Sequence, residues 1–339
     1  MSVMNTDPIP ASKPAETPLL EVSGLTVRFG SPDGEVHAVE DVSFTLGRGE
    51  SIGIVGESGS GKTVTCTSLT WLLPSPPARY VNGRIRYDTR ELRRDDEGTL
   101  RAVRGSRIAM VFQNARAALD PSYRIGQQLH EILAAHGQPR SAATRRIVVE
   151  TLRSCNIADP DALLERYPHE LSGGVAQRVT IAMALIVKPD VIIADEPTTA
   201  LDLLSQLEVL RLLERIRVDI GCSIVLVSHD LAVVRRIADR VLIMYAGRIV
   251  ERGSTEALFS DPRHPYTRAL LASSQQRLQG GQLYELAGQP PDLAHLPAGC
   301  SFSPRCPNAF DRCHVEDPRP IGFGVDREAR CFLLESDGD

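Results

Sequence analysis

Eight consecutive residues of this chain combine a glycine-rich loop with a lysine and a hydroxyl: Gly56-Glu57-Ser58-Gly59-Ser60-Gly61-Lys62-Thr63. The glycines let the backbone curl so that successive N–H groups, together with the start of a helix, surround an anion. Lys62 adds a full positive charge for β- and γ-phosphates, and the Thr63 hydroxyl can ligate Mg²⁺. The apolar run 51–55 before the loop indicates a strand, and residues 63–69 after it indicate a helix. This context favours a nucleotide site over a chance glycine-rich turn.

A second candidate for phosphate chemistry is the carboxylate pair Asp195-Glu196, which follows the apolar run 191–194. Ligands of open parallel sheets collect at the carboxyl ends of the strands, so we expect both acids to face the same nucleotide as Lys62. Asp195 is then the Mg²⁺ partner, through water, and Glu196 is placed to polarise the attacking water as general base. Such a pair could also cap the next helix, an interpretation that the following segment 197–202 disfavours.

Two further polar residues follow apolar strands, Gln113 after residues 108–112 and His229 after residues 224–228. Taken alone, each is more often an ordinary strand-end residue than a catalytic one. Between them lies Leu171-Ser172-Gly173-Gly174, where a helix running toward Leu185 would begin. A hydroxyl and backbone donors at a positive helix end make a second anion site.

These motifs, in this order, resemble the nucleotide-binding subunit of an ATP-binding cassette (ABC) transporter over roughly residues 18–260. The resemblance implies an α/β fold: a RecA-like core of parallel strands flanked by helices, an antiparallel β-subdomain and a helical subdomain at about residues 114–172. Apolar spacing within residues 125–133 and 147–152 fits helices in that subdomain. The cassette is expected to span residues 18–262.

The same resemblance implies roles for individual residues. Gln113 would sense Mg²⁺ and the membrane subunits, His229 would contact the γ-phosphate, and Asp202 would communicate across a dimer. Ser172, Gly173 and Gly174 would bind the γ-phosphate held by a partner subunit, so that two ATP molecules are closed between two cassettes. Phe29 is the candidate for stacking on adenine, although it could equally be a core phenylalanine. The chain departs from the common pattern at Val175, where glutamine is usual.

Composition limits the alternatives. Residues 1–17 are rich in Pro, Ser, Thr and Ala, which indicates a mobile tail, and no run approaches the eighteen apolar residues of a membrane span. The formal net charge of -5 gives no electrostatic argument for nucleic acid. The arginines between residues 79 and 107 alternate with acidic residues, which is typical of a solvated face.

The segment after the cassette, residues 263–339, narrows the substrate class. His264-Pro265-Tyr266-Thr267-Arg268-Ala269-Leu270-Leu271 resembles a segment of oligopeptide and dipeptide importer ATPases, with nickel importers as close relatives. The resemblance implies ATP-driven peptide import with two membrane permeases, a second ATPase subunit, identical or related, and indirectly an extracytoplasmic binding protein. The chain would then lie at the cytoplasmic face of the inner membrane as a peripheral subunit.

Four of the seven cysteines, Cys300, Cys306, Cys313 and Cys331, fall in this segment with gaps of five, six and seventeen residues. In a cytosolic chain such clustering argues for metal rather than disulfides. Zinc commonly uses two-residue gaps, whereas an iron–sulfur cluster accepts thiolates on wider loops. The family resemblance also implies a 4Fe-4S cluster, so we rank the cluster first, zinc second and free thiols third. Because the cysteines lie outside the nucleotide motifs, we expect a structural role for them.

Other classes of protein explain the sequence less well. A soluble ABC protein acting on ribosomes would usually carry two cassettes, and a DNA-repair ATPase would insert a long coiled coil between Gln113 and Leu171. A pure iron–sulfur sensor would not need both Glu196 and His229. We therefore expect an ATPase of a peptide importer, or of a nickel or other solute importer of the same family.

Overall fold

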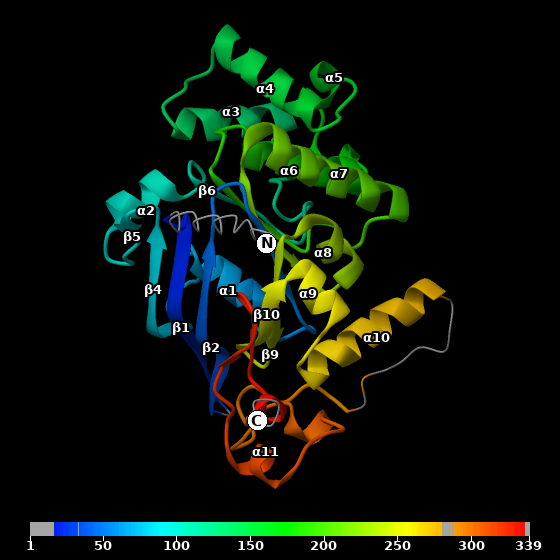
Figure 1. Cartoon of the computed structure of the whole chain (residues 1–339). Helices are drawn as coiled ribbons and strands as arrows, with labels where there is room; N and C mark the ends of the chain where they lie inside the picture. Colours follow the sequence, from blue (N-terminus) through cyan, green and yellow to red (C-terminus); the bar gives the residue numbers. More distant parts are fainter. Residues whose placement is uncertain (1–16, 33, 280–285, 287, 336–339) are drawn as a thin grey trace, which may run out of the picture.

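The computed structural model describes residues 17–32, 34–279, 286 and 288–335. The predicted tail, residues 1–17, lies outside the described residues except for Thr17. Two β-sheets, a group of helices at one end and a small C-terminal extension at the other make up the described chain (Figure 1). This arrangement matches the α/β cassette expected from the sequence.

The larger sheet carries the glycine-rich loop Gly56–Thr63, called the phosphate loop below, which follows strand β3. In the described chain its strand order is β11-β12-β10-β9-β3-β8-β7-β6. The central strands run parallel, and β10, β11 and β12 extend the sheet antiparallel on one side. The bounds are β3 Ser51–Val55, β6 Ile108–Val111, β7 Val191–Asp195, β8 Ser223–Ser228, β9 Arg240–Tyr245, β10 Arg248–Ser254, β11 Ile321–Gly322 and β12 Glu328–Ala329. Strands β3, β7 and β8 are buried along their whole length, as their unbroken apolar runs require.

The smaller sheet is antiparallel, with the order β2-β1-β4-β5 among the described residues. Its strands are β1 Leu20–Ser31, β2 Gly34–Leu46, β4 Ala78–Tyr87 and β5 Arg90–Glu91. The inner faces of both sheets share one apolar core, in which Val27 and Phe44 pack with Ile54 and Val227. A hydrogen bond from the Tyr87 hydroxyl to the Asp190 carboxylate ties β4 to the segment before β7.

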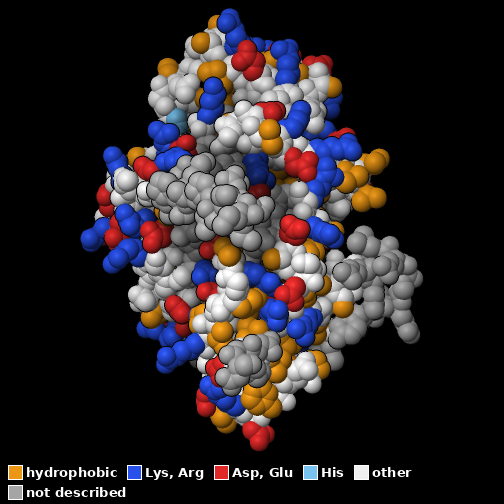
Figure 2. Space-filling view, viewed as in Figure 1, with side chains coloured by type: hydrophobic (Ala, Val, Ile, Leu, Met, Phe, Trp, Pro, Cys, Tyr) orange, Lys and Arg blue, Asp and Glu red, His pale blue; other side chains and the backbone are white. Residues whose placement is uncertain are grey.

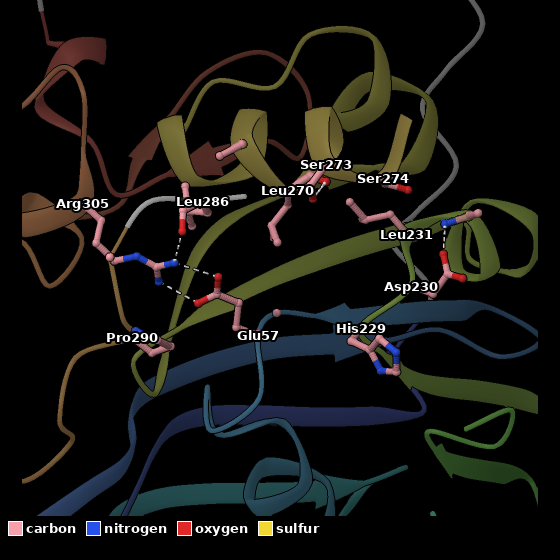
Figure 3. Close-up of a pocket in the computed structure, with 14 residues that line it drawn as sticks. Glu57, His229, Asp230, Leu231, Leu270, Ser273, Ser274, Leu286, Pro290 and Arg305 are labelled. Carbon is pink, nitrogen blue, oxygen red and sulfur yellow. Dashed lines mark hydrogen bonds and ion pairs between the residues drawn. The ribbon is translucent and has the colours of Figure 1, made fainter. Parts of the chain in front are cut away.

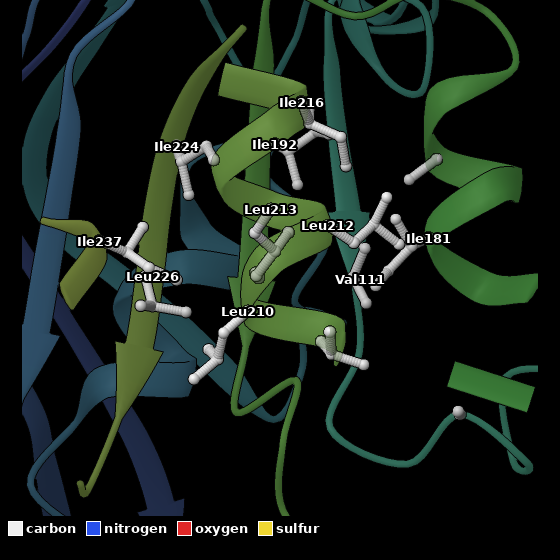
Figure 4. Close-up of a cluster of buried hydrophobic side chains, with 14 of the residues drawn as sticks. Val111, Ile181, Ile192, Leu210, Leu212, Leu213, Ile216, Ile224, Leu226 and Ile237 are labelled. Atoms are coloured by element: carbon white, nitrogen blue, oxygen red, sulfur yellow. The ribbon is translucent and has the colours of Figure 1, made fainter. Parts of the chain in front are cut away.

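Helices cover the other face of the large sheet. Leu212, Leu213 and Ile216 of α7 pack with Ile181 of α6 and Ile192 of β7 in one buried cluster (Figure 4). Burying each such side chain contributes roughly 1.5–3 kcal/mol. The helices of the cassette are α1 Lys62–Ser68, α2 Glu97–Val103, α3 Ile125–Ala135, α4 Ala142–Ser154, α5 Pro160–Leu164, α6 Gly173–Leu185, α7 Leu203–Ile220, α8 Leu231–Ile237 and α9 Thr255–Ser260, with a 3₁₀ turn at Pro168–Glu170.

Helices α3 and α4 fall on the two segments whose apolar spacing predicted them. With α5 they form the group at the upper end of Figure 1, away from the small sheet. The side-chain hydroxyl of Ser141 accepts a hydrogen bond from the Thr144 N–H at the start of α4, which satisfies an otherwise unpaired donor. Leu129 and Leu152 are fully buried between these helices and the rest of the core.

The C-terminal extension folds back onto the cassette. It contains helix α10 Pro265–Gln279, the short helix α11 Asp311–Val315 and 3₁₀ turns at Ser303–Arg305 and Phe332–Leu334. Strand β12 pairs with β10, and the His37 N–H of β2 donates to the Leu293 carbonyl at 2.9 Å. Tyr266, buried at the start of α10, packs against Tyr245 and Phe302 with ring centroids 4.6 and 5.4 Å away. The extension is therefore joined to both sheets.

Charged side chains of both signs are interspersed over the visible face, including the region of β4 and α2 (Figure 2). This mixture agrees with the alternation of arginines and acids in residues 79–107. No helix in the described ranges combines the length and the apolar character of a membrane span.

Candidate functional site

The phosphate loop is packed too tightly for any residue except glycine at position 61. Gly61 has φ of 97°, and a Cβ there would lie 2.3 Å from the carbonyl oxygen of Ala38 on β2. The turn between β9 and β10 also contacts the loop, because the Gly247 N–H donates to the Ser60 carbonyl at 3.0 Å. The loop is thus held between β2 of the small sheet and the β9–β10 turn of the large one.

Lys62 lies within the loop and is 5% exposed. Its ammonium group donates hydrogen bonds to the carbonyl oxygens of Gly56 at 2.8 Å and Glu57 at 2.7 Å. Burial lowers the pKa of Lys62, and the negative charges of Glu196 and Asp195 oppose that shift. The carboxylates of Asp195 and Glu196 therefore lie near enough to Lys62 to influence its charge.

Asp195, the last residue of β7, has the environment of a cation ligand. It is 2% exposed, and its Oδ1 is a buried oxygen that lacks a hydrogen-bond partner among the described residues. Burial raises its pKa, and a side-chain hydrogen bond with Thr63 and the charge of Lys62 oppose the shift. Burying a carboxylate oxygen without a partner costs free energy of folding. Asp195 and the Thr63 hydroxyl therefore fit Mg²⁺, which prefers oxygen ligands.

Glu196 is the point on which the other strand-end residues converge. Its Oε2 accepts hydrogen bonds from Gln113 Nε2 at 3.1 Å and Thr199 Oγ1 at 2.8 Å, and His229 Nδ1 lies 3.2 Å from it. The backbone of Glu196 has φ of 45°, a conformation that costs a non-glycine residue roughly 1 kcal/mol or more. Sequence order placed Gln113 and His229 here, whereas Thr199 was missed because nothing in its spacing sets it apart.

The segment Leu171–Gly174 leads into α6, which begins at Gly173. The Ser172 hydroxyl accepts a hydrogen bond from the Val175 N–H at 3.4 Å, and Ser172 itself is exposed. Gly173 shares a cavity with Gln113 and Thr199, whereas Gly56, Glu57 and His229 line a different one. The exposed hydroxyl is therefore available to another molecule.

Asp202 and Phe29 have local structural partners. Asp202 caps α7, because its carboxylate accepts hydrogen bonds from the Ser205 N–H at 3.0 Å and the Ser205 hydroxyl at 2.6 Å. The next two residues, Leu203 and Leu204, are 71% and 74% exposed. Phe29 is half-buried against the apolar core shared by the two sheets, which leaves part of its ring accessible for stacking.

The extension reaches the phosphate loop, which sequence reasoning did not foresee. The guanidinium of Arg305 pairs with the Glu57 carboxylate, and the Glu57 N–H donates to the Tyr266 hydroxyl at 2.9 Å. Arg305, Glu57, His229 and the start of α8 line one open cavity (Figure 3). The extension that carries the cysteines therefore contacts the glycine-rich loop through Arg305 and Tyr266.

The four cysteines of the extension line one small cavity, together with His264 and Phe302. Burial raises the pKa of Cys300 to about 11, with the neighbouring cysteines adding to the shift, and burial also raises the pKa of Cys306 and Cys331. Within the described ranges, however, no three His, Cys, Asp or Glu side chains converge closely enough to hold a metal ion. The predicted metal centre is thus not supported by this arrangement, in which the thiols surround a cavity without meeting.

Comparison with known proteins agrees with the geometry. Residues 39–199 match the family described as ABC transporter, and residues 250–313 match the one described as oligopeptide/dipeptide transporter, C-terminal region. The chain is 45% identical to the dipeptide transport ATP-binding protein DppD of Bacillus subtilis (strain 168), over 94% of this chain and 95% of that protein. It is 41% identical to the oligopeptide transport ATP-binding protein OppD of Escherichia coli (strain K12), over 98% of each.

Solved structures show the same fold. The ATP-binding cassette MJ0796, solved as a dimer bound to ADP and phosphate, superposes with a TM-score of 0.62 at 26% identity, covering 70% of this chain and 98% of that one. The Clostridium perfringens protein cbiO1, part of the transporter complex cbiONQ, gives a TM-score of 0.61 at 26% identity, covering 78% and 96%.

Fold and site together define an ATPase built on the ATP-binding cassette. With the relatives above, the chain belongs to the family of ATP-binding proteins of oligopeptide and dipeptide ABC transporters. The resemblance read from the motifs is confirmed.

The position of Glu196 yields a direct test of its chemistry. Glu196→Gln should keep ATP binding and lower steady-state hydrolysis about a hundred- to ten-thousand-fold, because the amide keeps the shape but cannot accept the proton. Glu214→Gln, which removes a half-buried α7 carboxylate paired with Arg236, is the matched control and should hydrolyse ATP normally. Phosphate release by the Glu196→Gln variant at the wild-type rate would show that Glu196 is not the general base.

Proposed function

We propose that this chain is the ATP-hydrolysing subunit of an importer of dipeptides or oligopeptides. The observation that carries the proposal is the match of residues 250–313 to the peptide-transporter region, in which Arg305 is paired with Glu57 of the phosphate loop. Two relatives that match this chain over nearly their whole length are named for dipeptide or oligopeptide transport. A nickel or other solute importer of the same family is the alternative.

The proposed chemistry follows from the groups at the sheet edge. The loop N–H groups and Lys62 would hold the β- and γ-phosphates, while Thr63 and Asp195, with Gln113 nearby, would hold Mg²⁺. When bound, Mg²⁺ would supply positive charge against the charge that develops on the phosphates. Glu196 takes the proton of the attacking water, and His229, which lies beside the same carboxylate, contacts the γ-phosphate.

The site is completed by a second chain. Ser172, with the backbone of Gly173 and Gly174, presents donors to the γ-phosphate in the partner's loop, and Asp202 lies at the same interface. The exposed Leu203 and Leu204 next to Asp202 suit burial by a partner. That partner is an identical copy or a related second ATPase.

The proposed assembly places each part of the chain in a transporter. The cassette at residues 18–262 hydrolyses ATP, and its helical subdomain at about residues 114–172 contacts the membrane subunits. Two permeases form the pathway, and an extracytoplasmic binding protein delivers the solute without touching this chain. The subunit is then peripheral, at the cytoplasmic face of the inner membrane, with residues 263–339 as the peptide-importer extension.

A metal group in the extension is part of the proposal. Four thiols are the donors on which this part rests: Cys300, Cys306, Cys313 and Cys331 line one cavity, although they do not converge on one point among the described residues, and the chain crosses itself closely beside Cys313. At that crossing a Cβ on Gly299 would lie 2.4 Å from the Cys313 carbonyl oxygen. These cysteines would hold a 4Fe-4S cluster, or zinc as the alternative, once their protons are displaced. The bound metal group would serve as a covalent cross-link between parts of the extension.

Metal analysis tests this part separately. Protein purified without oxygen should be brown and contain about four irons per chain, as Cys₄ ligation of a 4Fe-4S cluster requires. Cys306→Ser should lose the iron, while Cys222→Ser, which changes a buried cassette thiol, should keep it. Colourless protein with one equivalent of zinc would favour the alternative, and metal-free protein with a folded extension would reject both.

Uptake measurements test the transported solute. Cells that lack this chain should lose uptake of labelled di- and oligopeptides, and the wild-type gene should restore it whereas Glu196→Gln should not. Retained peptide uptake with lost nickel uptake would favour the alternative importer. If every tested solute entered at the normal rate, the transport proposal would fail.

A further inference from the structure

Glu57, the second residue of the phosphate loop, is fixed from several directions. Its N–H donates to the Tyr266 hydroxyl at 2.9 Å, and its carbonyl oxygen accepts from Lys62 Nζ at 2.7 Å and from the Ser60 N–H at 3.2 Å. Its carboxylate accepts two hydrogen bonds from Arg305, at 2.7 and 3.0 Å. The Glu57 carbonyl is therefore one of the two backbone acceptors that hold the Lys62 ammonium, beside the Gly56 carbonyl at 2.8 Å.

Arg305 is built into the extension as a fixed group. Its side chain is 5% exposed, and its guanidinium lies over the Tyr245 ring, 5.9 Å from the centroid, and donates to the Leu286 carbonyl at 3.4 Å. Figure 3 shows its planar fork directed at Glu57 from the opposite wall of the cavity. A bidentate pair of this kind fixes both distance and orientation.

The segment that carries Arg305 is anchored close by. Phe302, 1% exposed, packs edge-on to Tyr245 with ring centroids 5.2 Å apart and also touches Tyr266. The 3₁₀ turn Ser303–Arg305 follows directly, so the guanidinium has little freedom to move away from the loop. The same aromatic cluster holds Tyr266, the other contact of the extension with Glu57.

The Arg305–Glu57 ion pair also reduces electrostatic repulsion in the loop. A carboxylate next to Gly56 stands in a loop that must receive a polyanion, and like charges repel strongly where water is partly excluded. The Arg305 charge neutralises Glu57 and leaves Lys62 to act on the phosphates. Removing Arg305 would both free the loop and expose the repulsion.

We propose that Arg305 is a positioning residue for the phosphate loop, acting through Glu57 to hold Lys62 ready for ATP. The extension is then part of the nucleotide site and not only an appendage of the cassette. The inference concerns ATP binding alone and does not depend on which solute is transported.

The first experiment measures ATP affinity. In the full-length Glu196→Gln chain, which does not consume ATP, Arg305→Gln should raise the Kd for Mg-ATP about tenfold, the size expected for losing a charge-assisted hydrogen bond. Arg305→Lys keeps the charge without the fork and should raise it about threefold. In chains with Glu196 intact, kcat at saturating ATP should stay within about twofold, since Arg305 does not touch the reacting atoms.

A matched control separates positioning from simple anchoring. Arg330→Gln breaks another ion pair between the extension and the cassette, with Asp41 of β2 at 3.0 Å, away from the loop. It should lower the melting temperature without changing the Kd for ATP. If Arg305→Gln and Arg305→Lys change the Kd no more than Arg330→Gln, the proposal is overturned. Should Arg305→Gln fail to fold, the Lys variant decides in the same way.

A double-mutant cycle tests the route. If Arg305 acts through Glu57, then Arg305→Gln should change the Kd by less than about twofold in a Glu57→Gln background. Equal effects of Arg305→Gln with and without the Glu57 carboxylate would contradict the proposal.

Discussion

The carboxyl ends of the parallel strands β3, β6, β7 and β8 meet at one edge of the large sheet, and the site depends on that convergence. Each strand belongs to the sheet's buried core, so its length and register are fixed by packing. The first polar residue beyond each strand must then emerge at the same edge. Glu196 gathers Gln113 and His229 in this way, although they are 83 and 33 residues distant in sequence.

The site at the carboxyl ends of these strands contains several features that cost free energy of folding, and neighbouring parts of the fold stabilise it. Glu196 has a positive φ, Asp195 buries an unpaired oxygen among the described residues, and Lys62 is charged in a buried loop. In the proposed site, a Mg-nucleotide would relieve the last two costs by supplying a cation to Asp195 and an anion to Lys62. The small sheet, the β9–β10 turn and the extension each contact the loop, so the binding conformation is maintained from three sides.

The parts of this site that could be predicted from sequence are those encoded by contiguous residues. The loop Gly56–Thr63 and the pair Asp195-Glu196 each follow an apolar run directly, so their sequence alone predicts the strand and the chemistry of the residues after it. The order of the motifs then made Gln113 and His229 candidates for the same site. Arg305 could not be placed, because 248 residues separate it from Glu57 and one arginine among many carries no signal. Tyr266 lay in a recognised segment, yet only the fold brings its hydroxyl to the loop. The cysteine spacing predicted a metal centre, and the structure shows the four cysteines lining one cavity without three of them converging among the described residues.

The central claim is that this chain holds half of an ATP site and that Ser172 of a partner closes it. Light scattering on the Glu196→Gln chain, with its partner ATPase present where the pair is heteromeric, measures that closure directly. ATP should drive formation of the closed dimer, and adding Ser172→Arg should abolish it through bulk and misplaced charge while ATP still binds at Lys62. A Ser172→Arg chain that dimerises with ATP as completely as its parent would contradict the account.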